Sequence, residues 1–321
     1  MASHATTSNE VPASEGPAAG GASPTGRGSK GLGKAGLGKV GLGQALRLGV
    51  ARDGVALLRS SRWRGAPLTL LAERACAVPD NTHGGADFTA LALALDQVLA
   101  GADCAGWPLS VVLDDDLARL WQVAPPQGAA RLADLRAAAA MRFQALYGEA
   151  LEGWKMVAGW HPRVPFFGAL PLALLDVLER GAAAHKLCIV GVVPHFVDAW
   201  NRWQGALKPD AWFGVLHGSL LTLGACEGGR LRAIRTLALP HGAEHYWLTQ
   251  MLAREALLLD LAPPAQLQVC GPVPAAWRQG AANPANPAHP AHPACVALER
   301  DTPAVQAWPA AALLARSGSR A

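Results

Sequence analysis

The stretches LRLGVARDGVALLR, residues 46–59, and WFGVLHGSLLTLGACEGGRLRAIRTL, residues 212–237, decide the fold. In the first, two apolar runs flank the Asp53-Gly54 pair, which is typical of the tight turn of a β-hairpin. In the second, three apolar runs are separated by His217-Gly218-Ser219 and Glu227-Gly228-Gly229, whose glycines suit turns. The sequence therefore predicts a hairpin near its start and a three-stranded meander about two-thirds along.

The chain around these two stretches alternates apolar runs with segments of helical apolar spacing, which is typical of an α/β protein. We expect further strands at 68–73, 108–113, 154–160, 186–193, 266–269 and 295–299, and helices at 88–99, 128–147, 170–184, 196–207 and 241–259. Asp114, Asp115 and Asp116 follow one of these strands and are expected to cap the next turn.

Composition excludes several function classes. With 321 residues and 51% apolar residues, the chain can bury a large core, while a net charge of +4 gives little support to nucleic-acid binding. Six scattered cysteines form no CxxC pair and do not indicate a zinc ribbon. The sequence shows neither a membrane-spanning run nor a signal-peptide pattern, so we expect a cytoplasmic protein.

Residues 1–45 are rich in Gly, Ala and Ser and have few large apolar side chains, so we expect them to be disordered. They contain a short repeat, in which Gly33 to Lys39 has the spacing of a phosphate-binding loop. Val40 stands where such a loop needs Ser or Thr to bind Mg²⁺, and no strand precedes it. A flexible basic linker is the better interpretation of this segment.

A hairpin, then helix and strand, then a second meander is the duplicated plan of actin-like ATPases, and the order here resembles the pilus-assembly protein PilM and the cytoplasmic part of the secretion protein GspL. The segments that carry the resemblance are 111–126, 132–147, 170–187 and 189–203. It implies a two-lobed actin-like fold, a duplicated ribonuclease H-like α/β fold. On this basis we expect a first lobe with an inserted subdomain at 46–185, a second lobe at 186–274, and a Pro-rich loop and tail at 275–321.

The sequence departs from this family at the elements that hold nucleotide. Actin-like ATPases place an Asp at the end of the first strand of each hairpin to hold Mg²⁺, but Ala51 occupies that position here. The second hairpin has no acid between Asp210 and Glu227, and Pro272 follows a single Gly at the nucleoside turn. A vestigial nucleotide site is therefore predicted at these residues: Asp53, Gly54, His217, Gly218, Ser219 and Gly271.

The resemblance implies a non-catalytic scaffold that docks a cytoplasmic segment of an inner-membrane pilus or type II secretion component, such as a PilN-like peptide. The membrane would then be reached only through that partner, and no cofactor is expected. Trp200, Arg202 and Trp203 on one predicted helix are candidate partner contacts, since Trp and Arg often anchor interfaces. Core packing is the competing interpretation of the two tryptophans.

Two enzymatic alternatives remain open. The first is an ATPase that binds Mg-ATP with Asp53 as a displaced metal ligand. The second, weaker one is a zinc hydrolase, because His241, Glu244 and His245 match an inverted zincin pattern, which requires a third ligand for which Glu255 is one option. No catalytic residue is assigned from the sequence.

Overall fold

The computed structural model describes residues 43–61, 67–76, 87–128, 131–159, 165–278, 293–299, 305 and 307–317. Of the predicted disordered segment, residues 1–45, the positions up to 42 lie outside the described residues. Two five-stranded sheets and one three-stranded sheet organise the described chain.

The first sheet has the strand order β3-β2-β1-β4-β8. Its strands are β1 (Gln44–Val50), β2 (Gly54–Ser61), β3 (Thr69–Ala75), β4 (Pro108–Leu113) and β8 (Cys188–Pro194). The first three strands are antiparallel, while β4 runs parallel to both β1 and β8. Strands β1, β2 and β4 are apolar and buried along most of their length, so both faces of this part of the sheet must be covered.

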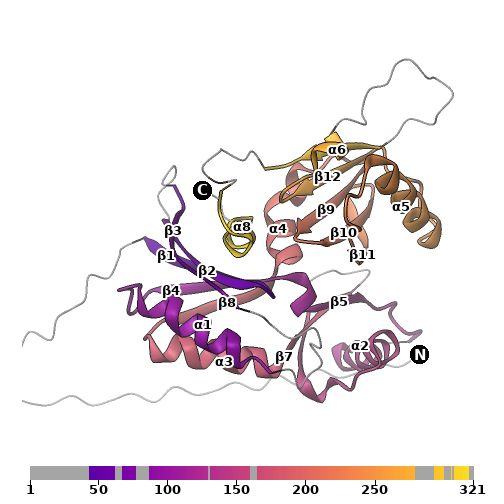
Figure 1. Cartoon of the computed structure of the whole chain (residues 1–321). Coiled ribbons are helices and arrows are strands. Elements are labelled where there is room, and N and C mark those ends of the chain that lie inside the picture. The colour runs from indigo at the N-terminus through magenta and orange to yellow at the C-terminus, as the bar shows by residue number, and fades with distance from the viewer. Residues whose placement is uncertain are drawn as a thin grey trace, which may run out of the picture. The chain divides into compact units, whose positions relative to one another are not determined.

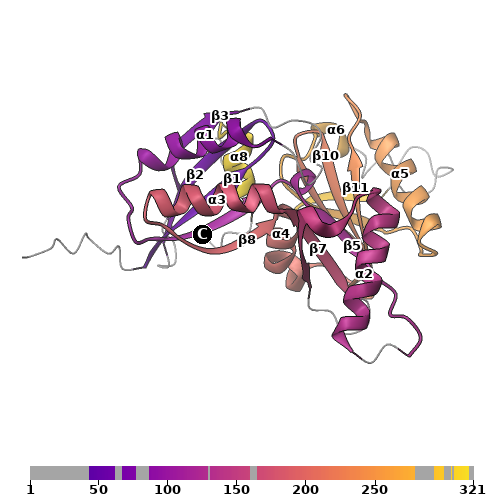
Figure 2. The ribbon, with the colours of Figure 1, turned by 90° about the horizontal axis from the view of Figure 1, so that it is seen from below.

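Helices cover the two faces of the first sheet (Figures 1 and 2). Side chains of α1 (Thr89–Ala100) and α3 (Leu172–Ala184) pack with those of β1, β2 and β4 in one apolar core. The opposite face carries α8 (Ala310–Arg316), whose alanines pack against β2. A Cβ atom added to Gly49 would lie 1.9 Å from the Ala311 carbonyl oxygen, so the close approach of α8 requires glycine here.

The second sheet repeats this strand order as β11-β10-β9-β12-β13. Its strands are β9 (Ala211–His217), β10 (Leu220–Glu227), β11 (Arg230–Ala238), β12 (Gln266–Cys270) and β13 (Ala294–Ala297). Its core includes residues of α4 (His195–Trp203), α5 (His245–Leu258) and α6 (Ala275–Arg278). Figure 1 shows α4 and α5 on opposite sides of this sheet.

A small sheet of order β5-β7-β6 accounts for the inserted region. It consists of β5 (Arg119–Gln122), β6 (Trp154–Ala158) and β7 (Phe166–Pro171), and α2 (Leu132–Tyr147) packs on it. Phe143 and Phe167 flank Trp121 with ring centroids 5.2 and 5.9 Å away. Three short 3-10 helices complete the described elements, at Asp115–Leu117, Leu151–Gly153 and Gln204–Ala206.

The strand order confirms the predicted actin-like α/β fold with two lobes, because each five-stranded sheet is an antiparallel meander continued by parallel strands. Several predicted boundaries need correction. The sequence predicts a second lobe that begins at 186 and so includes β8. Strand β8 instead pairs with β4 in the first sheet. Residues of the predicted tail after 275 form β13, which pairs with β12, and α8, which lies on the first sheet. No helix in the described ranges is long and apolar enough to cross a membrane.

Candidate functional site

The first hairpin turn is short and packed. The Ala51 backbone N–H donates to the Gly54 carbonyl oxygen at 2.9 Å, which closes the turn. The Ala51 side chain is fully buried and belongs to the apolar cluster that contains the alanines of α8. A carboxylate at this position would face methyl groups instead of a metal ion. Asp53 is exposed at the tip of the turn.

The second hairpin turn brings His217, Gly218 and Ser219 beside the turn that follows β12. Gly218 and Gly271 both have positive φ, 54° and 95°. A Cβ atom on Gly271 would lie 2.1 Å from the Leu216 carbonyl oxygen, so β9 and the Gly271 turn touch through their backbones. This contact requires glycine on both conformational and steric grounds.

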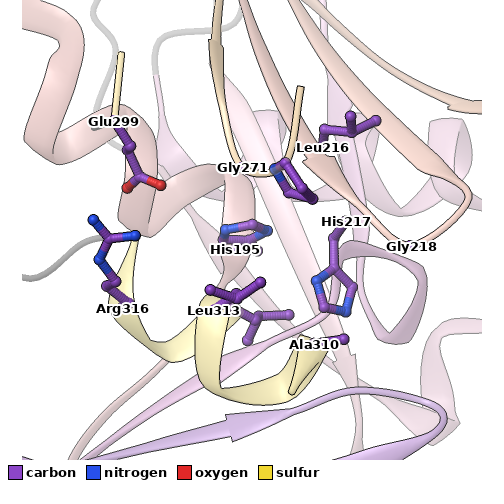
Figure 3. A pocket seen from close by; sticks show the side chains of 11 residues that line it. His195, Leu216, His217, Gly218, Gly271, Glu299, Ala310, Leu313 and Arg316 are labelled. Atoms are coloured by element: carbon purple, nitrogen blue, oxygen red, sulfur yellow. The ribbon is translucent and has the colours of Figure 1, made fainter. Parts of the chain in front are cut away.

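A small cavity lies between the second hairpin and α8 (Figure 3). His217 and Gly218 line it on one side and Glu299 and Arg316 on the other, with Leu313 of α8 between them. Its volume is about 40 Å³. A water molecule needs about 10–15 Å³ on this scale, so the cavity has room for a few water molecules and not for a nucleotide.

The acidic group that the second hairpin lacks in sequence is supplied by the first sheet. Asp114 follows β4, and its Oδ2 lies 3.3 Å from Nε2 of His217. Asp115 accepts the backbone N–H of Phe196 at the start of α4, at 2.9 Å, and Asp116 pairs with Arg52. The sequence predicted only a turn cap here. No local signal shows that β4 ends beside the β9–β10 turn.

Burial dominates the electrostatics of this cluster. It raises the pKa of Asp114 to about 8, helped by the nearby Asp116 and Asp115 carboxylates. It raises the pKa of Asp115 to about 7 against the opposing hydrogen bonds from Phe196 and Thr222. Burial lowers the pKa of His217, and that of His195 more strongly. Each shift favours the neutral form of the group.

A second and larger cavity of about 400 Å³ borders the first hairpin. It is lined by Asp53 and Gly54, by Glu73 and Arg74 of β3, and by the start of α8 from Pro309. The predicted vestigial residues are therefore divided: His217, Gly218 and Gly271 line the small cavity, whereas Asp53 and Gly54 line the large one.

The candidate partner residues lie on α4. The Trp200 ring stacks on Phe196 at 6.2 Å and also contacts Phe213, so it contributes to the core of the second lobe. Trp200 also lines a groove of about 320 Å³, together with Phe166 and Ile234. The Arg202 guanidinium lies 4.8 Å from the Trp203 ring.

The zincin pattern does not form one helical face. Helix α5 begins at His245, so His241 lies in the turn before it, where Gly242 has positive φ. Nε2 of His245 lies 3.2 Å from the Pro293 carbonyl oxygen. Within the described ranges, no group of three or more His, Cys, Asp or Glu residues is arranged to hold a metal ion.

The site and the sheets thus define a protein of actin-like fold whose hairpin turns are engaged in internal contacts. Solved structures of this type include the cytoplasmic domain of EpsL, an inner-membrane component of the type II secretion system of Vibrio cholerae. It matches with 14% identity and a TM-score of 0.47, over 72% of this chain and 83% of that chain. A Bacteroides thetaiotaomicron protein of unknown function with an actin-like ATPase fold matches with 10% identity and a TM-score of 0.49, over 75% of this chain and 87% of that chain.

The PilM-PilN type IV pilus biogenesis complex is also similar, with 17% identity and a TM-score of 0.42, over 66% of this chain and 65% of that chain. No protein-family model matches the sequence. No characterised protein matches it by sequence comparison. Because identity is low throughout, the fold assignment rests on the strand order of the two sheets.

Proposed function

We propose that this chain is a protein-binding scaffold of actin-like fold that does not turn over nucleotide. The observation that carries the proposal is the state of the two hairpin turns. Ala51 is buried against α8, and His217 is engaged by Asp114 beside a cavity of about 40 Å³. The first strand of neither hairpin ends in a carboxylate, and the Ala51 backbone N–H is used within its own turn, whereas an actin-like ATPase needs an acid and open backbone amides there.

Isothermal titration of the full chain with Mg-ATP tests this proposal. We expect no saturable heat at millimolar nucleotide. Micromolar binding that Asp53→Ala abolishes would overturn the proposal in favour of a nucleotide-binding protein.

That alternative has one observation in its favour. The cavity of about 400 Å³ at the first hairpin is of the size of small-molecule sites and contains the Asp53 and Glu73 carboxylates together with Arg74. Mg²⁺ is held by carboxylates, and Arg binds phosphate. If nucleotide binds, both Asp53→Asn and Arg74→Ala should weaken it, while Asp198→Asn on α4 should not.

The groove that contains Trp200 is the docking surface that we propose for the partner. Phe166, Phe196 and Trp200 give it an aromatic lining, and Leu231 and Ile234 of β11 add apolar surface. Asn201, Gln204 and Arg230 supply polar groups at its wall. An aromatic floor with an Arg at the rim suits an extended peptide that carries apolar side chains beside an acidic one.

We infer that this peptide is a cytoplasmic segment of an inner-membrane pilus or secretion component, the partner implied by the resemblance of element order to PilM and GspL. The chain would then lie in the cytoplasm and reach the membrane through its partner. The groove is formed by α4, β11 and the inserted sheet, so the insertion contributes directly to docking.

Fluorescence anisotropy with the synthetic N-terminal cytoplasmic segment of the PilN-like protein from the same cell tests this surface. Arg230→Glu should weaken binding about fivefold, since a rim charge pair contributes about 1 kcal/mol. Arg254→Glu, at an exposed position of α5, makes the same charge change elsewhere and should leave binding unchanged. Equal losses in both variants, or no binding by the wild type, would overturn docking at this groove.

A further inference from the structure

Two buried side chains from different sheets meet beside the small cavity. Asp114 follows β4 of the first sheet, and His217 ends β9 of the second. Their side chains are 10% and 9% exposed, and Oδ2 lies 3.3 Å from Nε2. The second Asp114 oxygen, Oδ1, is buried and has no hydrogen-bond partner in the described chain. Backbone hydrogen bonds from Asp115 and Asp116 favour the charged form of Asp114, but the effect of burial is larger.

His195 adds a third buried polar group to the same place. It begins α4, is 2% exposed and lines the cavity with His217, its ring centroid 5.9 Å from that of His217. Neither of its ring nitrogens has a hydrogen-bond partner among the described residues. A neutral imidazole has one donor and one acceptor to satisfy, so water in the cavity is its natural partner.

We propose that the contact between the two five-stranded sheets is held closed by one proton that Asp114 and His217 share, and that it opens when this proton is lost. With one proton, the pair has no net charge, whichever of the two atoms holds it. Without the proton, Asp114 is a buried carboxylate facing a neutral imidazole. The contact then gains water access because charged Asp114 must be solvated.

The charges around the pair favour this behaviour. Asp115 and Asp116 follow Asp114 in the chain and raise its pKa, and Asp53 of the β1–β2 turn interacts with His217. Arg52 comes from that same turn and is already paired with Asp116.

The remaining charged groups lie on other elements. Arg47 of β1 pairs with Asp198 of α4, and Arg316 and Glu299 line the far side of the cavity. The Arg47 guanidinium also donates to the Ala315 carbonyl oxygen at 2.6 Å. The Arg47 contacts do not involve Asp114. They therefore hold the sheets together while the contact between Asp114 and His217 opens.

The direction of the pH effect follows from burial. Asp114 has a raised pKa of about 8, so the closed state retains the proton through neutral pH and loses it as pH rises through this value. His195 and His217 have lowered pKa values, so they stay neutral over this range and do not oppose the change. Opening is therefore an alkaline transition.

Modification of histidines by diethyl pyrocarbonate, followed by peptide mass spectrometry on the full chain, tests the proposal. His217 should be protected at about pH 6.5 and should become reactive by about pH 9, its rate rising by roughly an order of magnitude relative to His241. His241 is exposed and serves as the internal reference at every pH. An unchanged ratio of the two rates would overturn the proposal.

Asp114→Asn supplies the matched variant, because an amide imitates the protonated carboxyl and cannot ionise. It should keep His217 protected at about pH 9. Asp176→Asn changes an exposed carboxylate of α3 instead and should retain the alkaline rise. A rise in Asp114→Asn equal to that of the wild type would overturn the proposal. If Asp114→Asn does not fold, the wild-type series alone decides.

Discussion

The two hairpins hold equivalent positions in the two lobes, yet their turns are engaged in different ways. The first turn, at Ala51 to Gly54, is closed by its own backbone bond and covered by the apolar helix α8. The second turn, at His217 to Ser219, is polar and borders a small cavity, and Asp114 of the other lobe reaches it. Both lack the acid of an actin-like ATPase, but one turn is packed and the other is hydrogen-bonded.

If neither hairpin holds nucleotide, as we propose, the two turns differ in the physical reason. Small apolar residues let a helix approach the first hairpin until backbone atoms nearly touch, which Gly49 allows. At the second hairpin, burial shifts the pKa values of Asp114 and His217 so that both groups favour their neutral forms. Restoring an acid in the first turn should lower the free energy of unfolding. The contacts of the second turn should depend on pH.

The largest expected effect comes from Ala51→Asp, which restores the missing acid in the packed turn. Ala51 is fully buried against α8, so the new carboxylate would be buried without a cation. We expect a loss of about 3 kcal/mol in the free energy of unfolding, measured with urea, and no gain of Mg-ATP binding. A stable variant that binds Mg-ATP would mean that the first turn is still open to metal.

Gly49→Ala should have the second-largest effect on stability, because the added Cβ atom would lie 1.9 Å from the Ala311 carbonyl oxygen. We expect a loss of about 2 kcal/mol in urea unfolding, since α8 must shift away from β1. Gly191→Ala in β8 is the matched control, because its Cβ would meet no atom within 4 Å. If both substitutions have the same effect, the close approach of α8 is not what Gly49 provides.

The polar side of the comparison predicts a pH dependence of stability. The raised pKa values of Asp114 and Asp115, about 8 and about 7, mean that the folded state binds protons that the unfolded chain has released. Stability therefore falls as pH rises through these values. Below about pH 6.5 the lowered pKa values of His195 and His217 act the other way, because the unfolded imidazoles take up protons.

We therefore expect the free energy of unfolding to fall by about 1–2 kcal/mol between about pH 6.5 and about pH 8. Asp115→Asn keeps an acceptor for the Phe196 N–H and removes one of the two titrations, so it should reduce this slope by about half. Urea unfolding at several pH values measures both slopes. A stability that rises over this interval would show that these carboxylates are ionised in the folded protein.

The smallest expected effect is that of Asp53→Asn. Asp53 is exposed at the tip of the first turn, so its loss should change stability by less than about 0.5 kcal/mol. A larger change, measured in the same unfolding experiment, would indicate that Asp53 holds the turn or a bound ion.

The sequence predicts the fold better than the site. Alternating apolar runs and Asp-Gly or Gly-Gly turns locate both meanders, and the order of elements identifies the duplicated plan. The short strand β7 is missed because six residues carry little periodicity. Helix α8 is missed because an alanine-rich segment after a Pro-rich loop shows no amphipathic pattern.

The site is less predictable because its contacts join distant parts of the chain. Glycine and turn chemistry indicate Gly218 and Gly271, which both have positive φ, and the Gly271 turn lies against β9. Asp114 is visible as an acid after a buried strand, but its partner His217 lies in the other lobe. Only the parallel pairing of β1 with β4, and of β9 with β12, places these strand ends, and no local pattern encodes it.

Hydrogen–deuterium exchange of the full chain with and without saturating Mg-ATP tests the central claim most directly, because it examines both hairpins at once. The central claim is that the two turns are engaged in internal contacts and leave no nucleotide site. We predict the same exchange in both conditions at residues 49–56 and 214–221. Nucleotide-dependent protection of both segments would contradict the claim.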